Sequence, residues 1–292
     1  MHIPVTVGNC EISKITEQTA SFKLTSLFSD HLCDMADDED KYIELSVHSW
    51  VIKTAGDIIL IDTATGNHRN RNNVPLFHQL NTDYLQNFRQ AGFSPEDVTY
   101  VLLTHLHTDH VGWNTDGQEG EWKPLFPNAR YICSEIELVH CKTDEKRRAL
   151  YQDSIFPLIE NGKLETINIQ ASPLFAGIVK FMPTPGHSID HASIILESAG
   201  EYALFTGDVM HNPVQFAHPH WNSVFCENKP LAERSRRKAI DWCKEHDALW
   251  FSSHFPGTSY GRILNGKRPA PADAASGGPD QLPSADATFV KL

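Results

Sequence analysis

Short apolar runs alternate with polar, glycine- and proline-containing segments along most of this chain. Period-two or continuous apolar runs bounded by turn residues predict strands at 43–53, 57–63, 99–103, 130–133, 164–169, 178–182, 192–196 and 202–206. Apolar residues at helical spacing predict helices at 83–92, 134–141, 146–160 and 230–246. This order of elements fits two β-sheets packed face to face with helices on the outside, an α+β architecture.

The last of these helices, 230–246, shows the pattern of a half-buried surface helix. Its predicted buried side holds Leu231, Ala239, Trp242 and Cys243. The basic run 234–238 is interpreted as a solvated face of the helix rather than a phosphate-binding site.

Composition divides the chain into a folded domain at 1–264 and a C-terminal tail at 265–292. The tail is rich in Ala, Pro, Gly, Ser and Asp, and it holds too few apolar residues to fold alone. We expect a flexible extension in which Phe289 and Val290 form a weak docking point.

Charge and length exclude several classes of protein. The net charge is -12, from 25 basic and 37 acidic residues, which disfavours nucleic acid as a partner. No apolar stretch reaches about 18 residues, so no membrane span is expected. Six cysteines without a C-x-x-C pair and an N-terminus without a secretory pattern predict reduced thiols in a cytoplasmic protein.

The run from Thr104 to His110 holds the highest density of candidate metal ligands in the chain. It places three histidines and an aspartate directly after the apolar run 101–103. Imidazole and carboxylate are ligands that suit zinc and similar transition metals. Three further candidate ligand segments follow, at 184–187, 205–208 and 252–254, so a metal site is favoured over a polar loop with chance histidines.

The H-x-H-x-D-H pattern at 105–110 resembles the signature of the metallo-β-lactamase superfamily, and the later segments fit its order over about residues 45–264. The resemblance implies the αβ/βα four-layer sandwich of that family. It also implies two Zn²⁺ ions, or other divalent transition metals. One metal would be held by His105, His107 and His187, the second by Asp109, His110 and His254, and Asp208 would bridge them.

The same resemblance implies a metal-dependent hydrolase with no organic cofactor. A hydroxide bridging the two metals would attack the substrate, and Asp109 would guide the proton to the leaving group. Leu106 and Thr108 occupy spacer positions where the superfamily's diiron sites usually carry a glutamate, which favours hydrolysis over redox chemistry. Asp62, at the end of the strand 57–63, is expected to hydrogen-bond a ligand histidine or to brace its loop.

A closer branch is indicated by 209–216 and 254–257, which are similar to the methyl parathion hydrolase-like branch with its lactonases and aryl esterases. Acyl homoserine lactonases commonly have a tyrosine three residues after the bridging aspartate. His211 stands there in this chain, and it is the second candidate catalytic residue, as a hydrogen-bond donor to the substrate. The segment 184–191 is also similar to loops of pyridoxolactonases.

Substrate selection is expected from aromatic residues in the loops around the metals. The candidates are Trp50, Trp113, Phe216, Trp221, Phe225 and Phe255, with core packing an equal alternative for Trp50 and Phe255. The polar stretch 114–122 is interpreted as a rim loop, and His191 as a core histidine or one that braces the metal site.

The leading hypothesis is a dinuclear zinc hydrolase of small-molecule lactones or esters. Organophosphate triester hydrolysis shares every ligand and stays an alternative, as does a glyoxalase-type thioesterase. A metal-binding scaffold without activity would be expected to have lost ligands, and a serine hydrolase is excluded by the absence of a G-x-S-x-G elbow. Relatives of this family are often dimers, so the resemblance also implies a homodimer.

Overall fold

The computed structural model describes residues 4–35, 41–118, 120–265 and 287–292. The first sheet has the order β1-β2-β3-β4-β5-β8-β9 and the second the order β10-β11-β12-β13-β14-β15. The strands of the first sheet are β1 (Val5–Val7), β2 (Cys10–Lys23), β3 (Tyr42–Lys53), β4 (Ile58–Ile61), β5 (Tyr100–Leu102), β8 (Arg130–Ser134) and β9 (Leu164–Ile167). Those of the second are β10 (Val179–Pro183), β11 (Ala192–Ser198), β12 (Glu201–Phe205), β13 (Leu249–Phe251), β14 (Tyr260–Asn265) and β15 (Ala287–Lys291).

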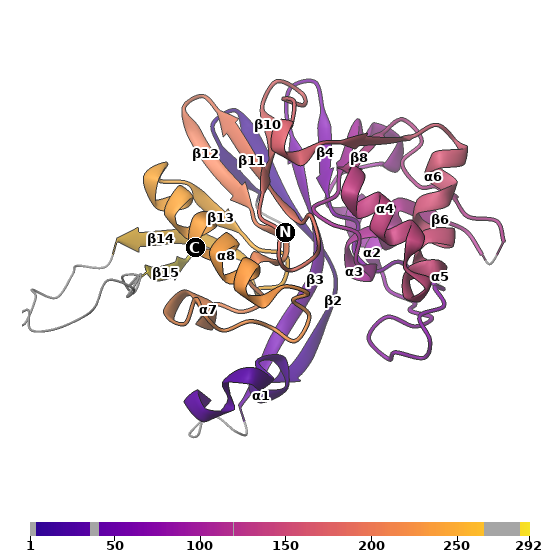
Figure 1. Cartoon of the computed structure of the whole chain (residues 1–292). Coiled ribbons are helices and arrows are strands. Elements are labelled where there is room, and N and C mark those ends of the chain that lie inside the picture. Colours follow the sequence, from indigo (N-terminus) through magenta and orange to yellow (C-terminus); the bar gives the residue numbers. More distant parts are fainter. Residues whose placement is uncertain (1–3, 36–40, 119, 266–286) are drawn as a thin grey trace, which may run out of the picture.

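Helices cover the outer faces of both sheets (Figure 1). They are α1 (Leu24–Leu27), α2 (Tyr84–Gln90), α3 (Thr108–Val111), α4 (Glu135–Thr143), α5 (Arg148–Leu150), α6 (Phe156–Glu160), α7 (Val214–Ala217) and α8 (Lys229–Glu245). A small hairpin, β6 (Thr115–Asp116) and β7 (Lys123–Pro124), stands apart from the two sheets. Strands β2 and β3 run beyond the rest of their sheet and carry α1 at the tip (Figure 1).

Three apolar layers explain why the chain folds in this way. Side chains of a strand alternate between its two faces, and here both faces of the central strands are apolar. In β4, Ile59 and Ile61 point into the core between the sheets, where they meet Phe205 and Phe251 of the second sheet. Leu60 points outward to the layer that contains α2.

The outer face of the second sheet packs on α8 in the same manner. Leu204 and Trp250 form one core with Ala239 and Ile240 of the helix. The order helix, sheet, sheet, helix confirms the predicted αβ/βα four-layer sandwich.

Helix α8 departs from the prediction in one important residue. Arg236, which the sequence analysis placed in a solvated basic run, is buried, while Leu231 and Trp242 are only half-buried. Its guanidinium donates to the carbonyl oxygens of Val209 and Pro219. A buried cation is tolerated here because backbone and amide oxygens replace its water shell.

The predicted helix 146–160 is interrupted in its middle. Between α5 and α6 lies a π-helical turn at Tyr151–Ile155, followed by Pro157 in the first turn of α6. Proline lacks the N–H that would continue the regular pattern, which explains why the helix changes geometry at this point.

The end of the chain contributes β15, which pairs with β14 in antiparallel register. The Phe289 ring stacks on Phe216 with centroids 4.7 Å apart. Residues 266–286 of the predicted tail lie outside the described ranges, so its flexibility stays a prediction. All six cysteines lie within the described ranges and are free thiols. Among the described helices, none has the length and hydropathy needed to cross a bilayer.

Candidate metal centre

The four predicted ligand segments follow the ends of four strands. Residues 105–110 follow β5, His187 follows β10, Asp208 follows β12, and His254 follows β13. Because β5 runs parallel to β4 and β12 runs parallel to β13, these carboxyl ends gather where the two sheets meet along one edge. The backbone is extended at His107 and then turns into α3, which redirects Asp109 and His110.

All seven predicted ligands lie in one cluster with Asp208 at its centre. Oδ2 of Asp208 is 3.2 Å from Nε2 of His187 and 3.0 Å from Nε2 of His254. Its Oδ1 is 3.2 Å from Nε2 of His110, and its Oδ2 is 4.0 Å from Nε2 of His105.

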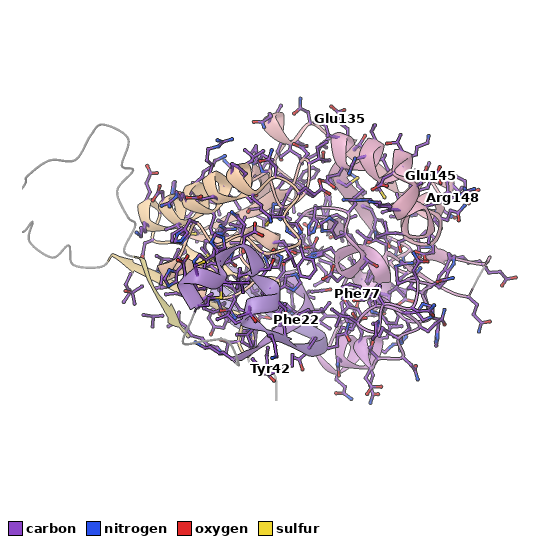
Figure 2. All side chains as sticks on the ribbon, turned by 60° about the horizontal axis from the view of Figure 1, so that its bottom comes forward. Phe22, Tyr42, Phe77, Glu135, Glu145 and Arg148 are labelled. Carbon is purple, nitrogen blue, oxygen red and sulfur yellow. The ribbon has the colours of Figure 1, made fainter. Side chains whose placement is uncertain are left out.

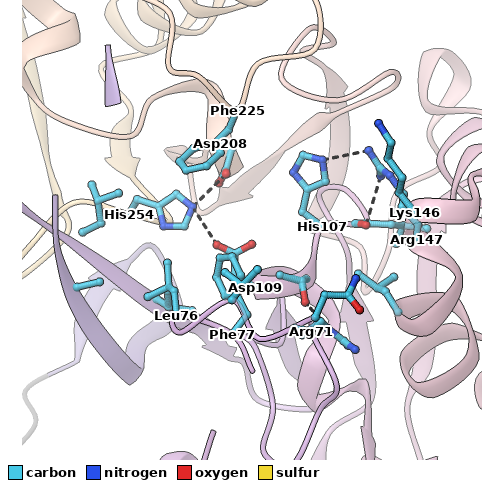
Figure 3. A pocket seen from close by; sticks show the side chains of 18 of the residues that line it. Arg71, Leu76, Phe77, His107, Asp109, Lys146, Arg147, Asp208, Phe225 and His254 are labelled. Atoms are coloured by element: carbon cyan, nitrogen blue, oxygen red, sulfur yellow. Dashed lines mark hydrogen bonds and ion pairs between the residues drawn. The ribbon is translucent and has the colours of Figure 1, made fainter. Parts of the chain in front are cut away.

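The remaining ligands divide into two groups on either side of Asp208. Nδ1 of His107 lies 2.9 Å from Nε2 of His187. The carboxylate of Asp109 lies 3.8 Å from Nε2 of His254 and 3.9 Å from Nε2 of His110 (Figure 3). The groups His105-His107-His187 and Asp109-His110-His254 can therefore each surround one ion.

Each histidine of the cluster is oriented by a partner on the nitrogen that points away from it. Four turn Nε2 inward and use Nδ1 outward, whereas His107 turns Nδ1 inward. The outward partners are Thr104 Oγ1 for His105, Asp62 for His110, Cys226 Sγ for His187 and the Ser46 carbonyl for His254. Nε2 of His107 accepts a hydrogen bond from Arg147, which leaves the ring proton on Nδ1, so a metal bound there would displace that proton. Such outer partners fix the ring orientation of metal-binding histidines.

Several of the nitrogen and oxygen atoms that point into the cluster are better suited to bind a metal ion than to hydrogen-bond one another. Nε2 of His105, Nε2 of His110 and Oδ1 of Asp208 are buried without a hydrogen-bond partner. Buried polar atoms without partners are rare because they lose water and gain nothing in return. Nitrogen and carboxylate donors at this spacing match the preferences of zinc and similar ions, so the cluster fits a binuclear metal site.

Most charges of the cluster suit metal ligands, but the carboxylate of Asp208 raises the pKa of His110 and of His254 against the effect of burial, so these two rings would release a proton when a metal binds. Burial lowers the pKa of His105 and of His187 well below the usual value, so both rings are neutral at pH 7, the form that binds metals. Burial alone would raise the pKa of Asp208, but His110, His254 and His187 hold it well below the ordinary range. Asp208 is therefore a carboxylate, as a bridging ligand must be.

His191 braces the loop that carries Asp208. Its Nε2 accepts the backbone N–H of Asp208 at 2.9 Å, and its Nδ1 bonds to the Thr184 carbonyl at 3.1 Å. Burial lowers the pKa of His191 to about 3, so the ring stays neutral. Gly207 precedes Asp208 with φ +54°, and a Cβ there would lie 2.5 Å from Nε2 of His191. The predicted bracing role of His191 is confirmed.

Asp62 also has the role that the sequence predicted. Its Oδ2 lies 2.8 Å from Nδ1 of His110, and it accepts both the N–H and the hydroxyl of Thr104. The carboxylate thereby ties β4 to the first ligand segment.

Replacing Asp62 by asparagine is expected to weaken metal binding by about 10- to 100-fold, because the His110 ring loses its charged partner. Titration of the metal-free variant with Zn²⁺ under a competing chelator measures this change. Asp57→Asn, at the start of the same strand and away from the cluster, is the matched control. Unchanged affinity in Asp62→Asn would contradict the role of Asp62.

His211 lies on the far side of Asp208 and is fully buried. Its Nε2 is 3.4 Å from Oδ2 of Asp208 and 3.5 Å from Oγ of Ser223. Its Nδ1 has no hydrogen-bond partner. Burial lowers its pKa, so the ring is neutral, and it lines the same pocket as the metal cluster.

The pocket that opens onto the cluster has a volume of about 400 Å³. Its polar end holds His107, Asp109, Asp208 and His254 (Figure 3). Its walls are mostly apolar and come from β2, β3, the segment between β4 and α2, and the region of α5; they include Phe22, Leu45, Val47, Val74, Leu76, Phe77, Leu150 and Phe225.

Most of the aromatic residues expected at the rim lie elsewhere. Of the six candidates, only Phe225 lines the pocket. The other five are core residues: Trp50, Trp113, Phe216, Trp221 and Phe255. Trp113 stacks on Tyr84 in the outer core, because the chain turns inward after α3. The described residues of the stretch 114–122, which exclude 119, do not line the pocket either, so for them the prediction of a rim loop was wrong.

Sequence reasoning missed the residues that form the actual wall. Several of them, including Val74, Leu76 and Phe77, lie in the irregular segment between β4 and α2, which runs from Asp62 to Asp83. A segment of that length without regular structure is uncommon in a compact domain unless it has a function. The length of this segment was therefore the feature of the sequence that could have identified it as part of the functional site.

The fold and the His/Asp cluster together define a metal-binding αβ/βα sandwich with a binuclear type of site. Residues 42–250 match the metallo-beta-lactamase superfamily, and the chain belongs to this family. A probable metallo-hydrolase of Mycobacterium tuberculosis is 26% identical over 182 residues, which cover 58% of this chain and 58% of the relative. An N-acyl homoserine lactonase of a Bacillus species is 26% identical over 60% of this chain and 70% of its own length. The chain thus spans just over half the length of the mycobacterial relative.

Two solved structures show the same fold. AidC, described as a dizinc quorum-quenching lactonase, superposes with a TM-score of 0.73 at 22% identity, covering 94% of this chain and 98% of its own. The hydrolase AbOPH superposes with a TM-score of 0.74 at 23% identity, covering 91% and 94%. The likeness extends over nearly the whole chain, and it supports the fold that the two sheets define.

Proposed function

We propose that this protein is a dinuclear zinc hydrolase that opens lactones or cleaves esters of small apolar molecules. The observation that carries the proposal is the seven-residue cluster, in which three inward atoms, Nε2 of His105, Nε2 of His110 and Oδ1 of Asp208, lack hydrogen-bond partners while the histidines are held from outside. The lactonase among the curated relatives supports the reaction class. The dizinc lactonase among the structural neighbours supports the choice of metal.

Two zinc ions held by these residues would lower the pKa of a shared water and polarise the attacked carbonyl group. Asp208 sets the separation of the two ligand groups, because both approach its carboxylate. Asp109 lies at the polar end of the pocket with its carboxylate half-buried, where it can take a proton and pass it to the leaving oxygen. Neutral His211, which lines the pocket, would donate a hydrogen bond to the substrate oxygen.

The apolar walls of the pocket support a substrate with an apolar body. Its walls bring together apolar side chains from β2, β3 and the segment before α2, and its volume suits a small molecule. The reacting bond would lie at the polar end, and the acyl or aryl part would lie against the walls.

Hydrolysis across one panel of substrates, measured as proton release by the zinc-loaded enzyme, tests the proposal. The panel holds short- and long-chain lactones, aryl esters, an aryl phosphotriester and a glutathione thioester. We expect the highest kcat/KM among the lactones or esters. A preference for the phosphotriester or the thioester would contradict the substrate class. Metal analysis showing fewer than two ions per chain at full activity would contradict the dinuclear site.

Replacing His211 by phenylalanine is expected to lower kcat by about 100-fold for carbonyl substrates, since a positioned donor contributes on this order. The metal content should stay unchanged, because the other seven residues still hold both ions. Parallel kinetics and metal analysis measure the two effects. His218→Phe, in the loop after α7 and outside the pocket, is the control. Loss of one metal would assign His211 as a ligand instead.

A further inference from the structure

The segment between β4 and α2 forms one wall of the pocket although it has no regular structure. Val74, Leu76 and Phe77 of this segment line the pocket together with Phe22, Leu45 and Val47 of β2 and β3. Figure 2, which turns this side of the molecule forward, shows Phe22 and Phe77 there. The part of the molecule that would contact an apolar substrate is therefore a loop that needs support from elsewhere.

The backbone of this segment is unusual for non-glycine residues. Six of them have positive φ angles: Asp62 at 54°, Ala64 at 48°, His68 at 58°, Asn72 at 51°, Asn73 at 60° and Gln79 at 51°. Such conformations persist only where surrounding contacts hold them, and they concentrate at functional sites. The contacts that hold the segment converge on its arginines.

Arg71 is buried at the base of the wall and joins it to two other elements. Its Nη1 and Nη2 donate to the two carboxylate oxygens of Asp153 at 2.6 and 2.9 Å. Its Nε donates to Oγ1 of Thr108 at 2.6 Å. Thr108 lies between the predicted metal ligands His107 and Asp109, so one guanidinium connects the wall to the metal cluster (Figure 3).

Asp153 lies in the π-helical turn between α5 and α6, and it receives a second arginine from the same segment. Its backbone carbonyl accepts Nη1 of Arg69 at 3.0 Å and Oγ1 of Thr115 at 2.5 Å. In a regular α-helix this carbonyl would accept the N–H of residue 157, but Pro157 has none, so the carbonyl can accept partners outside the helix. The interruption of the helix thus allows the Asp153 carbonyl to bond to Arg69 and Thr115.

We propose that Arg71 is a positioning residue that holds residues 72–79 in place as one wall of the pocket. This wall selects substrates with an extended apolar acyl or aryl group. The bidentate pair with Asp153 fixes the direction of the guanidinium, and the bond to Thr108 fixes its distance from the metal ligands. Gln18 adds a bond to the Leu76 carbonyl from β2, at 2.9 Å. The substrate selectivity rests on the proposed function. The clamp, by which we mean the bonds of Arg71 to Asp153 and Thr108, does not.

Amide hydrogen exchange tests the clamp without any substrate. The amides of Val74, His78 and Gln79 bond to carbonyls within the segment, at 3.0, 2.8 and 2.8 Å. In Arg71→Lys a single ammonium cannot bond both carboxylate oxygens and Thr108, so these amides should exchange about tenfold faster or more. Arg89→Lys, on the exposed side of α2, is the matched control. Unchanged exchange in Arg71→Lys would overturn the proposal.

Kinetics with para-nitrophenyl acetate, hexanoate and octanoate test the selectivity. In Arg71→Lys, kcat/KM for octanoate should fall about tenfold relative to acetate, as expected when about two methylene groups lose their contacts. The loss should grow with chain length and lie mainly in KM, with the metal content unchanged. A loss equal at every chain length would overturn the proposal, because it would indicate general disturbance of the metal cluster.

Asp153→Asn provides a second route to the same result if Arg71→Lys folds poorly. It removes the charge from the other side of the pair and should give the same faster exchange and the same dependence on chain length. If the wild-type enzyme hydrolyses none of these esters, the proposed function fails, and the exchange experiment alone then supports or overturns the clamp.

Discussion

Replacing Asp208 by alanine is expected to reduce the bound metal from two ions per chain to one or none, and to lower kcat/KM by about a thousandfold or more. Asp208 is the residue whose carboxylate approaches histidines of both ligand groups. Without it, the two ions have no shared anionic ligand, and the charge stabilisation lost, several kcal/mol, corresponds to a factor of this size.

The measurement is metal analysis of the purified variant together with steady-state kinetics on the best substrate of the panel. Asp241→Ala, an exposed aspartate on α8, is the control for loss of a carboxylate as such. Circular dichroism should show a folded Asp208→Ala protein, because the two sheets pack through apolar cores away from the cluster. Full turnover with two bound metals would show that the site has been assigned to the wrong residues.

Replacing Arg236 by methionine is expected to lower the free energy of unfolding by about 3 kcal/mol. The buried guanidinium donates to the Val209 carbonyl at 2.9 Å, the Pro219 carbonyl at 2.5 Å and the Asn222 side chain at 3.3 Å. Methionine has a similar length and no donor, so buried acceptors lose their partners at about 1–3 kcal/mol each. For a chain of this size the melting temperature should fall by about 8 °C.

Thermal unfolding of the metal-free proteins measures this effect without a contribution from metal binding. Arg234→Met is the control, because Arg234 lies on the same helix and is exposed. Val209 follows Asp208 directly, so Arg236→Met should also weaken metal binding. Equal melting temperatures for the two variants would mean that the buried bonds of Arg236 contribute little.

Arg236 also shows where reasoning from composition fails. The run of basic residues from Arg234 to Lys238 is typical of a solvated helix face. Yet Arg236 lies four residues after Ala232 and four before Ile240, both of which are buried. The helical period thus placed it on the inner face. Spacing was a better guide than charge, because burial follows the face of the helix.

The aromatic residues show a different limit. Trp113 and Phe216 are close in sequence to predicted ligands, which made them candidates for the pocket rim. In the structure Trp113 donates its indole N–H to Glu17, far away in sequence, at 2.7 Å. Phe216 packs on Phe289 from the last strand. Nearness in sequence to a ligand does not fix the direction of a side chain once the chain turns.

The sequence by itself determined most of the elements between residues 43 and 206, the long helix near 230–246 and the set of candidate ligands, but not β1, β2 or the last three strands. Strand and helix patterns are local, and the ligand segments each follow an apolar strand, so both can be found without knowing the fold. The tertiary structure decided what holds and surrounds those ligands. Asp62 meets His110, and Arg71 meets Asp153, across 48 and 82 residues of chain. The pocket wall likewise combines Phe22 with Phe77. Such contacts depend on which faces pack together, and no local pattern encodes that.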